Sequence, residues 1–280
     1  HTGGTGHTGG TGHTGGTGRT GEAGGDGTVR CEIDGPVARI VLARPQAANA
    51  IDLAMSRALA TAVETAAAEQ VRAVLVTAEG PRFCAGGDLA AMATAPDRQA
   101  YLNRLAAQAG GVLERLSGLD KPVIAAVQGA VAGAGMALVL SCDLVICARS
   151  ATFRMAYAGV GLTPDCGVSY LLPRAIGQQR ALELALTGRV LSAAEACQWG
   201  LVTQVVDDDR LAEQAWRLAR RLADGPRFAL GQAKRLLRSA WHTSRRESYT
   251  DEAATIATAL TTSEAAALID GFLNRSAPKR

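Results

Sequence analysis

A run of 21 residues without a charged side chain, residues 122–142, constrains this chain more than any other feature. The run is long enough to span a bilayer, but it consists mostly of Ala, Val and Gly, and Gln128 and three glycines interrupt it. It divides into an apolar β run at 122–127, a glycine-rich turn at 128–135 and a short apolar helix at 136–142. We therefore predict a strand and a helix buried in one core, and no membrane span.

The first 27 residues differ sharply in composition from the rest. They repeat HTGGTG three times and contain 13 of the 32 glycines. Such a repeat has nothing to bury and loses much backbone entropy when it is ordered. We predict a disordered Gly/Thr-rich tail over residues 1–27, a folded core over 28–205 and a helical region over 206–280. Because the N-terminus lacks the apolar segment of an export signal, we expect a cytoplasmic location.

The remaining sequence alternates β runs with helical periodicity. Apolar β runs occur at 28–33, 37–42, 71–77, 122–127 and 143–147, with a shorter one at 152–155, and helical spacing occurs at 52–69 and 98–116. From residue 182 onward the pattern is largely helical. This order predicts an α/β fold with a C-terminal helical region. The six cysteines stand singly, without a C-x-x-C pair or a nearby histidine, so we predict no metal site.

Three segments contain residues that can carry chemistry. FCAGGDL at 83–89 is either an ordinary surface loop or a place where a ligand approaches free backbone N–H groups. The glycine-rich turn at 128–135 leads into a helix, whose first N–H groups lie at the positive end of its dipole. It lacks the third glycine and the acidic residue of a dinucleotide site. In the third segment Asp165 follows Pro164, where it is either the N-cap of a helix that begins at Cys166 or a functional carboxylate.

In this order and spacing the three segments resemble the enoyl-CoA hydratase/isomerase (crotonase) superfamily, from about residue 28 to the C-terminus. No single match is specific, but the ordered set is. The matching motifs are Arg44-Pro45 with Asn49-Ala50, FCAGGDL, KPVIAAVQG with GAG, SCDL at 141–144, GLTPDCG with LLPR at 161–174, LTG at 186–188, AAEA at 193–196 and WGLV at 199–202.

The resemblance implies a spiral of ββα units, C-terminal helices that form a homotrimer or hexamer, and an acyl-CoA thioester as substrate. Coenzyme A is then part of the substrate, and no resident cofactor is expected. The backbone N–H groups of Gly87 and Ala134 match the family's oxyanion hole, which holds the thioester oxygen. The resemblance places CoA near Gly87, Asp88 and Leu89. Arg44 and Lys234 are either phosphate contacts or solvated surface charges.

Departures from the family pattern indicate which reaction to expect. The hydratases of the family use two glutamates, where this chain has Ala137 and Tyr157. Asp165 lies eight residues beyond Tyr157, at the position of the working carboxylate in isomerase branches, and its surroundings are similar to the 1,2-epoxyphenylacetyl-CoA isomerase group. We therefore expect isomerisation of an enoyl double bond, or opening of a ring epoxide, through a thioenolate with Asp165 as acid and base. Tyr157 either packs in the core, lines the acyl pocket or donates a hydrogen bond.

Other functions stay open at this stage. A hydratase that uses non-standard residues and a CoA-binding protein without turnover both fit the missing glutamates. A hydrolytic aryl-CoA dehalogenase would use Asp165 as a nucleophile, but it also needs a histidine on the helix before the 122–127 strand, and none occurs between residues 14 and 241. Nucleic-acid binding is not expected, because the net charge is only +3 and the basic clusters at 217–221 and 234–238 are spaced as solvated helix faces.

Overall fold

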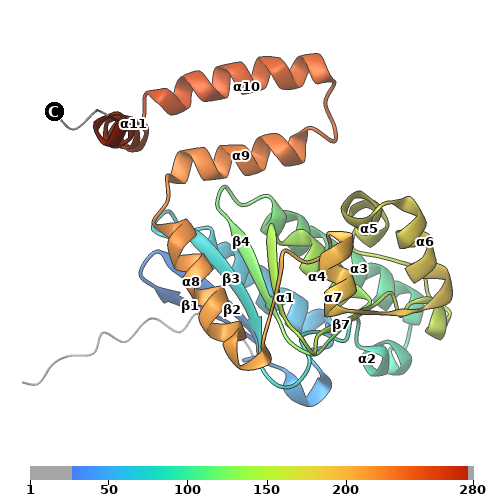
Figure 1. Cartoon of the computed structure of the whole chain (residues 1–280). Helices are drawn as coiled ribbons and strands as arrows, with labels where there is room; N and C mark the ends of the chain where they lie inside the picture. The colour runs from blue at the N-terminus through green and yellow to red at the C-terminus, as the bar shows by residue number, and fades with distance from the viewer. Residues whose placement is uncertain (1–26, 277–280) are drawn as a thin grey trace, which may run out of the picture.

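A computed structural model describes residues 27–276, so the predicted tail over residues 1–27 lies, except for its last residue, outside the described part of the chain. A six-stranded sheet has the order β1-β2-β3-β4-β6-β9 (Figure 1). Only the first pair is antiparallel. The strands are β1 (Val29–Asp34), β2 (Val37–Leu42), β3 (Ala73–Ala78), β4 (Val123–Val127), β6 (Leu144–Ala148) and β9 (Gln204–Val206).

Helices cover both faces of this sheet, which explains why its central strands read as continuous apolar runs. Every residue of β4 is buried. One face packs on α1 (Leu53–Ala66), α3 (Arg98–Ser117) and α4 (Ala134–Ser141). The opposite face packs on α8 (Leu211–Ala223), whose inward side contributes Leu211, Ala215, Ala219 and Ala223. The predicted α/β fold is confirmed. The remaining elements of the core are α2 (Leu89–Thr94), α5 (Val168–Ile176), α6 (Gln178–Thr187), α7 (Ala193–Trp199) and the 3-10 turns η1 (Pro45–Ala47), η2 (Ala158–Val160) and η3 (Asp208–Arg210).

The charge-free run forms a strand and a helix, as predicted, but the segment between them is more than a turn. Residues Ala130–Ala132 form β5, which pairs with β7 (Thr152–Arg154) in a second sheet of order β5-β7-β8. The third strand, β8 (Val190–Ser192), and β9 both lie in the region that the sequence predicted as largely helical. That prediction was wrong at these two places, because a strand of three residues is too short to produce a detectable alternation.

Three C-terminal helices, α9 (Arg227–Ser239), α10 (Arg245–Leu260) and α11 (Ser263–Ser276), extend away from the sheet (Figure 1). They lie in the region that the sequence predicted as largely helical, and Ser244 begins α10 with a capping box formed with Glu247. The division at residues 205 and 206 stays a prediction, and α8, the first helix beyond it, packs on the sheet. Among the described residues no single helix is long and apolar enough to cross a membrane. The pair α10 and α11, with a 77° bend between the two helices, could cross one by its length and composition only.

Candidate functional site

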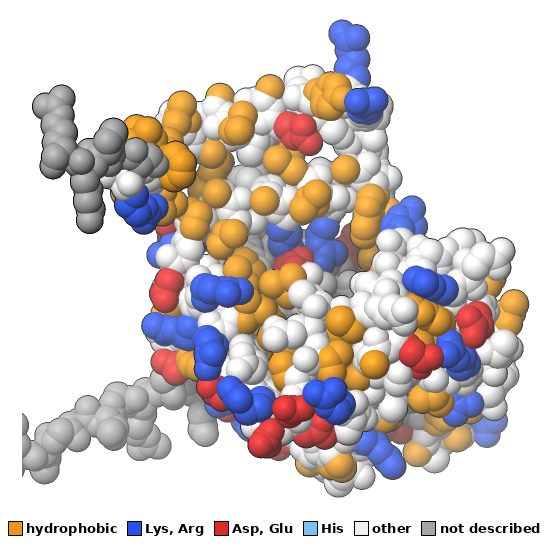
Figure 2. All heavy atoms as spheres, in the orientation of Figure 1, with side chains coloured by type: hydrophobic (Ala, Val, Ile, Leu, Met, Phe, Trp, Pro, Cys, Tyr) orange, Lys and Arg blue, Asp and Glu red, His pale blue; other side chains and the backbone are white. Residues whose placement is uncertain are grey.

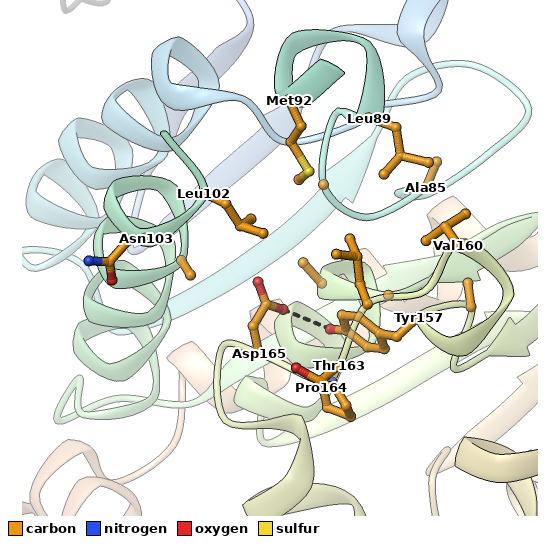
Figure 3. Close-up of a pocket in the computed structure, with 16 residues that line it drawn as sticks. Ala85, Leu89, Met92, Leu102, Asn103, Tyr157, Val160, Thr163, Pro164 and Asp165 are labelled. Carbon is orange, nitrogen blue, oxygen red and sulfur yellow. Dashed lines mark hydrogen bonds between the residues drawn. The ribbon is translucent and has the colours of Figure 1, made fainter. Parts of the chain in front are cut away.

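A cavity of about 290 Å³ opens between α2, α3 and the segment 156–165 (Figure 3). Most of its lining is apolar, as expected for a site that takes up an acyl group. Among the described residues that line it, Asp165 has the only charged side chain. The lining residues are Ala85, Gly87, Leu89, Met92, Leu102, Asn103, Ala106, Gly133, Ala134, Ala156, Tyr157, Val160, Leu162, Thr163, Pro164 and Asp165.

Two backbone segments meet at one wall of this cavity. The N–H of Cys84 donates to the carbonyl of Ala130 at 3.4 Å, and the carbonyl of Cys84 accepts from the N–H of Ala132 at 3.0 Å. The glycine loop therefore runs beside β5. A side chain at Gly86, where φ is +98°, would place Cβ only 2.9 Å from the Ala132 carbonyl oxygen and 3.3 Å from the nitrogen of Ala134. Glycine at residue 86 thus allows the two segments to lie against each other.

The N–H groups of Gly87 and Ala134 lie on this wall. Both residues line the cavity, and within the described residues neither N–H donates a hydrogen bond to the chain itself. Ala134 is the first residue of α4, so its N–H lies at the positive end of that helix. The structure brings together the two amides that the sequence singled out. That they hold a thioester oxygen stays a prediction.

Asp165 directs its carboxylate into the cavity rather than toward a helix end. The next helix, α5, begins at Val168, its N-cap is Gly167, and no side chain caps it. The alternative prediction, an N-cap role for Asp165 in a helix that begins at Cys166, was wrong. Cys166 and Gly167 have φ of 51° and 84°, and this left-handed backbone prevents the helix from beginning at Cys166. The Oδ1 atom of Asp165 accepts a hydrogen bond of 2.8 Å from the Tyr157 hydroxyl.

The side chain of Tyr157 is buried and lies between Asp165 and the glycine-rich turn (Figure 3). Burial raises the pKa of the Tyr157 phenol, and the negative charge of Asp165 raises it further. The Cys166 thiol next to Asp165 has a pKa raised to about 12, for the same two reasons. Both groups therefore keep their protons near neutrality, and Asp165 is the proton acceptor that the cavity offers.

Asp88 and Leu89 have different places relative to the cavity. Leu89 lines it, whereas the Asp88 carboxylate begins α2 by accepting the N–H of Ala91 at 3.0 Å and an Arg44 Nη1–H at 2.7 Å. Burial alone would raise the pKa of Asp88, but the hydrogen bonds from Ala91 and Arg44 outweigh it and lower the pKa. Asp88 therefore holds the glycine loop in place through its side chain, and the place of CoA near this residue stays a prediction.

Arg44 and Lys234, predicted either as phosphate contacts or as solvated surface charges, both pair with acidic side chains of the fold. Arg44 donates to the Ala50 carbonyl at 2.8 Å as well as to Asp88. The Lys234 side chain is only 9% exposed, and its ammonium lies 2.8 Å from an oxygen of Asp143, in a separate cavity beside α9. Neither side chain lines the main cavity. Since both cations are already paired inside the fold, they are not solvated surface charges, and their contact with a phosphate stays a prediction.

The sequence interpretation missed the wall of the cavity that α2 and α3 build. Met92 comes from α2, a helix of six residues that was not predicted, and Leu102, Asn103 and Ala106 come from α3. The apolar periodicity of α3 was visible in the sequence. It could show that one face is buried, but not that the end of this face opens into a cavity.

Comparison with known proteins places the chain among close relatives. A family model described as enoyl-CoA hydratase/isomerase matches residues 32–279. The chain is 42% identical over 214 residues to 1,2-epoxyphenylacetyl-CoA isomerase of Escherichia coli (strain K12), covering 74% of this chain and 80% of that protein. It is 33% identical over 212 residues to 4-chlorobenzoyl coenzyme A dehalogenase-2 of Arthrobacter sp, covering 75% and 77%. The crystal structure of an enoyl-CoA hydratase from Mycobacterium smegmatis matches with a TM-score of 0.84 at 34% identity, covering 90% of this chain and 98% of that one.

Proposed function

Because the chain belongs to the enoyl-CoA hydratase/isomerase (crotonase) family, we propose that it is an acyl-CoA isomerase that shifts a double bond within an enoyl-CoA thioester. The observation that carries this proposal is a single carboxylate, Asp165, in an otherwise uncharged cavity whose wall presents the N–H groups of Gly87 and Ala134. An aryl-acetyl-CoA epoxide is the second substrate class, and the 42% identity to 1,2-epoxyphenylacetyl-CoA isomerase supports it.

The two amides polarise the thioester. With the carbonyl oxygen between the N–H groups of Gly87 and Ala134, negative charge that develops on this oxygen is stabilised, and one such donor contributes about 3 kcal/mol to lowering a barrier. The donors belong to the backbone, so Ala at residue 134 serves as well as Gly would. The carbon next to the carbonyl becomes acidic as a result.

Asp165 then moves one proton between two carbons. In a β,γ-enoyl thioester the carboxylate takes a proton from the α-carbon, and the electron pair of that C–H bond passes into a dienolate held by the two amides. The neutral carboxylic acid returns the proton to the γ-carbon, and the double bond lies between the α- and β-carbons in the product. No proton, electron or atom is lost, and Asp165 is again a carboxylate.

Hydration by two glutamates finds no support in this chain. Ala137, at the first of the two positions, is fully buried within α4 and is not among the residues that line the cavity. Tyr157, at the second position, keeps its proton because burial raises its pKa. A hydrolytic dehalogenation would need a base beside Asp165, and the cavity residues of α3 are Leu102, Asn103 and Ala106.

The test is the conversion of trans-3-hexenoyl-CoA, followed by the rising absorbance of the conjugated product. We expect turnover by the wild type and a loss of kcat of about 10²-fold or more in Asp165→Asn. Asp207→Asn is the matched control, because Asp207 is exposed and pairs with Arg149 at 2.8 Å, outside the cavity. Full activity in Asp165→Asn, or hydration of crotonyl-CoA that does not depend on Asp165, would contradict the proposal.

We also propose that copies of this chain associate through the C-terminal helices, as a trimer or hexamer. No residue of α10 is buried within the chain, and Ile256, Leu260 and Leu273 are 72%, 64% and 58% exposed. Apolar side chains lie along these helices in Figure 2, and such surfaces mark interaction sites. Light scattering of the wild type and of Ile256→Asp tests this proposal, since the variant should have a lower mass. A cytoplasmic location and the lack of a metal or resident cofactor stay predictions.

A further inference from the structure

Two titratable side chains line the cavity within residues 27–276, Asp165 and Tyr157, and the proposed reaction does not use the Tyr157 phenol. Its ring lies beside the glycine-rich turn, because a Cβ built at Gly133 would lie 3.9 Å from Tyr157 Cζ. Its hydroxyl points to Asp165 (Figure 3) and donates to Oδ1 at 2.8 Å. The hydroxyl end of the ring therefore lies close both to Gly133, the residue before Ala134, and to the carboxylate of Asp165.

The position of this hydroxyl is fixed by the backbone around it. Tyr157 precedes the turn η2, and its carbonyl accepts the N–H of Val160 at 3.1 Å and the N–H of Leu162 at 3.0 Å. Only two side-chain torsions remain between this anchored backbone and a rigid ring, and the side chain is just 9% exposed. Ordering the phenol against Asp165 thus costs little additional entropy.

The phenol acts as a donor and not as a base. Burial, followed by the charge of Asp165, raises the pKa of Tyr157 well above its ordinary value. The O–H bond consequently stays intact whether Asp165 is a carboxylate or has taken up a proton. Because Oδ1 of Asp165 accepts this hydrogen bond, a proton taken from substrate is more favourably placed on the other oxygen, Oδ2.

We propose that Tyr157 is a positioning residue for the proton transfer: its hydroxyl holds Oδ1 of Asp165, so that Oδ2 alone takes the proton from the α-carbon and returns it to the γ-carbon. This inference rests on the proposed isomerisation. The C–H bond at the α-carbon breaks as the Oδ2–H bond forms, and the Oδ2–H bond breaks as the γ-carbon is protonated. The O–H bond of Tyr157 never breaks. Held in this way, the carboxyl group faces both carbons and loses few protons to water.

The test compares Tyr157→Phe with Tyr170→Phe. Both changes remove one hydroxyl from a tyrosine, but Tyr170 lies outside the main cavity and its hydroxyl faces His242 at 3.1 Å. In Tyr157→Phe we expect kcat to fall about tenfold or more with KM changed less than about twofold, since transition-state geometry is lost and substrate binding is kept. Tyr170→Phe should match the wild type. Thermal unfolding of each variant verifies that the fold is kept.

A second readout distinguishes the loss of carboxylate positioning in Tyr157→Phe from a general loosening of the site. In D2O, exchange of the α-proton with solvent is measured beside isomerisation, and the ratio of exchange to isomerisation should rise severalfold in Tyr157→Phe. Unchanged kcat, or a proportional loss of both rates, would show that the hydroxyl does not position the carboxylate, while the proposed function would stand if Asp165→Asn is inactive. Full activity in Asp165→Asn would instead refute the proposed function and this role with it.

Discussion

A single methyl group at residue 135 should separate the two amides that define the site. Gly135 is the second residue of α4, directly after Ala134. A Cβ at this residue would lie 2.5 Å from the carbonyl oxygen of Cys84 and 3.2 Å from its carbonyl carbon. Both atoms belong to the backbone, so no side-chain rotation can relieve the contact. The helix or the loop of Cys84 must move instead.

The size of this movement follows from the contact. An ordinary van der Waals separation begins at 3.4 Å, so the Cys84 carbonyl oxygen must retreat by about 0.9 Å. Cys84 lies three residues before Gly87, and the displacement therefore shifts the Gly87 amide relative to Ala134. A misplacement of about 1 Å can cost about 10²-fold in rate, which corresponds to about 2.7 kcal/mol of barrier. The loss of stability should be of similar size, about 1–3 kcal/mol, as for other overpacked cores.

The assay is kcat/KM for the β,γ-enoyl thioester in Gly135→Ala, with Gly111→Ala as the matched control. Gly111 lies within α3, and a Cβ at that residue meets nothing within 4 Å. The control should keep full activity and gain about 0.5–1 kcal/mol, because Ala is the better helix former. If Gly135→Ala folds and stays within about threefold of the wild type, the two amides do not form the oxyanion-binding wall in the way argued above.

Three further predictions concern stability and reactivity. Lys121→Met should lower the free energy of unfolding in urea by about 2–3 kcal/mol. The reason is that Nζ of this buried lysine donates to three carbonyls at the end of α1, those of Ala66, Ala67 and Ala68, at 3.3, 3.1 and 3.0 Å. A change below about 0.5 kcal/mol would contradict this capping role. The pKa of Tyr157 is raised in the folded protein, so its contribution to stability is complete below the unfolded phenol pKa of about 10 and declines as the pH rises above that value. Between pH 8 and 11 the wild type should therefore lose more stability than Tyr157→Phe. Equal losses would refute the link between this pKa and stability. Burial raises the pKa of the Cys84 thiol to about 11, so this thiol should resist Ellman's reagent at about pH 8 until urea unfolds the chain. Rapid labelling of Cys84 in the native protein would contradict this and show that the loop at 83–89 opens.

The sequence was most informative where the chemistry is local. Strands β3 and β4 were predictable because buried strands are continuous apolar runs. The small residues of the glycine loop and the glycine-rich turn indicated where two backbones can approach closely, whereas the two amide positions came from the resemblance to the family. The helical spacing that begins at residue 52 is likewise confirmed, since Asp52 caps α1 by accepting the N–H of Met55 at 2.7 Å. These features depend on neighbouring residues and on little else.

Prediction failed where a side chain meets a partner that is distant in the sequence. Arg44 and Lys234 carry charges that invite an anionic ligand, yet their partners Asp88 and Asp143 are 44 and 91 residues away, and only the fold brings them together. The same limit applies to Asp165. Its sequence context fits a helix cap, and only the backbone at Cys166, with φ of 51°, turns the carboxylate into the cavity.

The amide wall and the side chains that face it depend on the sequence in different ways, and this difference is the basis of the reaction that we propose. The amide wall consists of main-chain atoms, so it can hold a carbonyl oxygen whatever side chains stand opposite it, provided that Gly86 and Gly135 keep the backbones close. The proton chemistry depends on the opposite side, where Tyr157 and Asp165 lie on one short segment and are joined by a single hydrogen bond. Since that side offers one carboxylate and one phenol that keeps its proton, it suits a reaction in which the same group takes a proton and gives it back. Activation of a water molecule by two carboxylates would require a second acidic side chain, and at residue 137 that space is filled by the packed core.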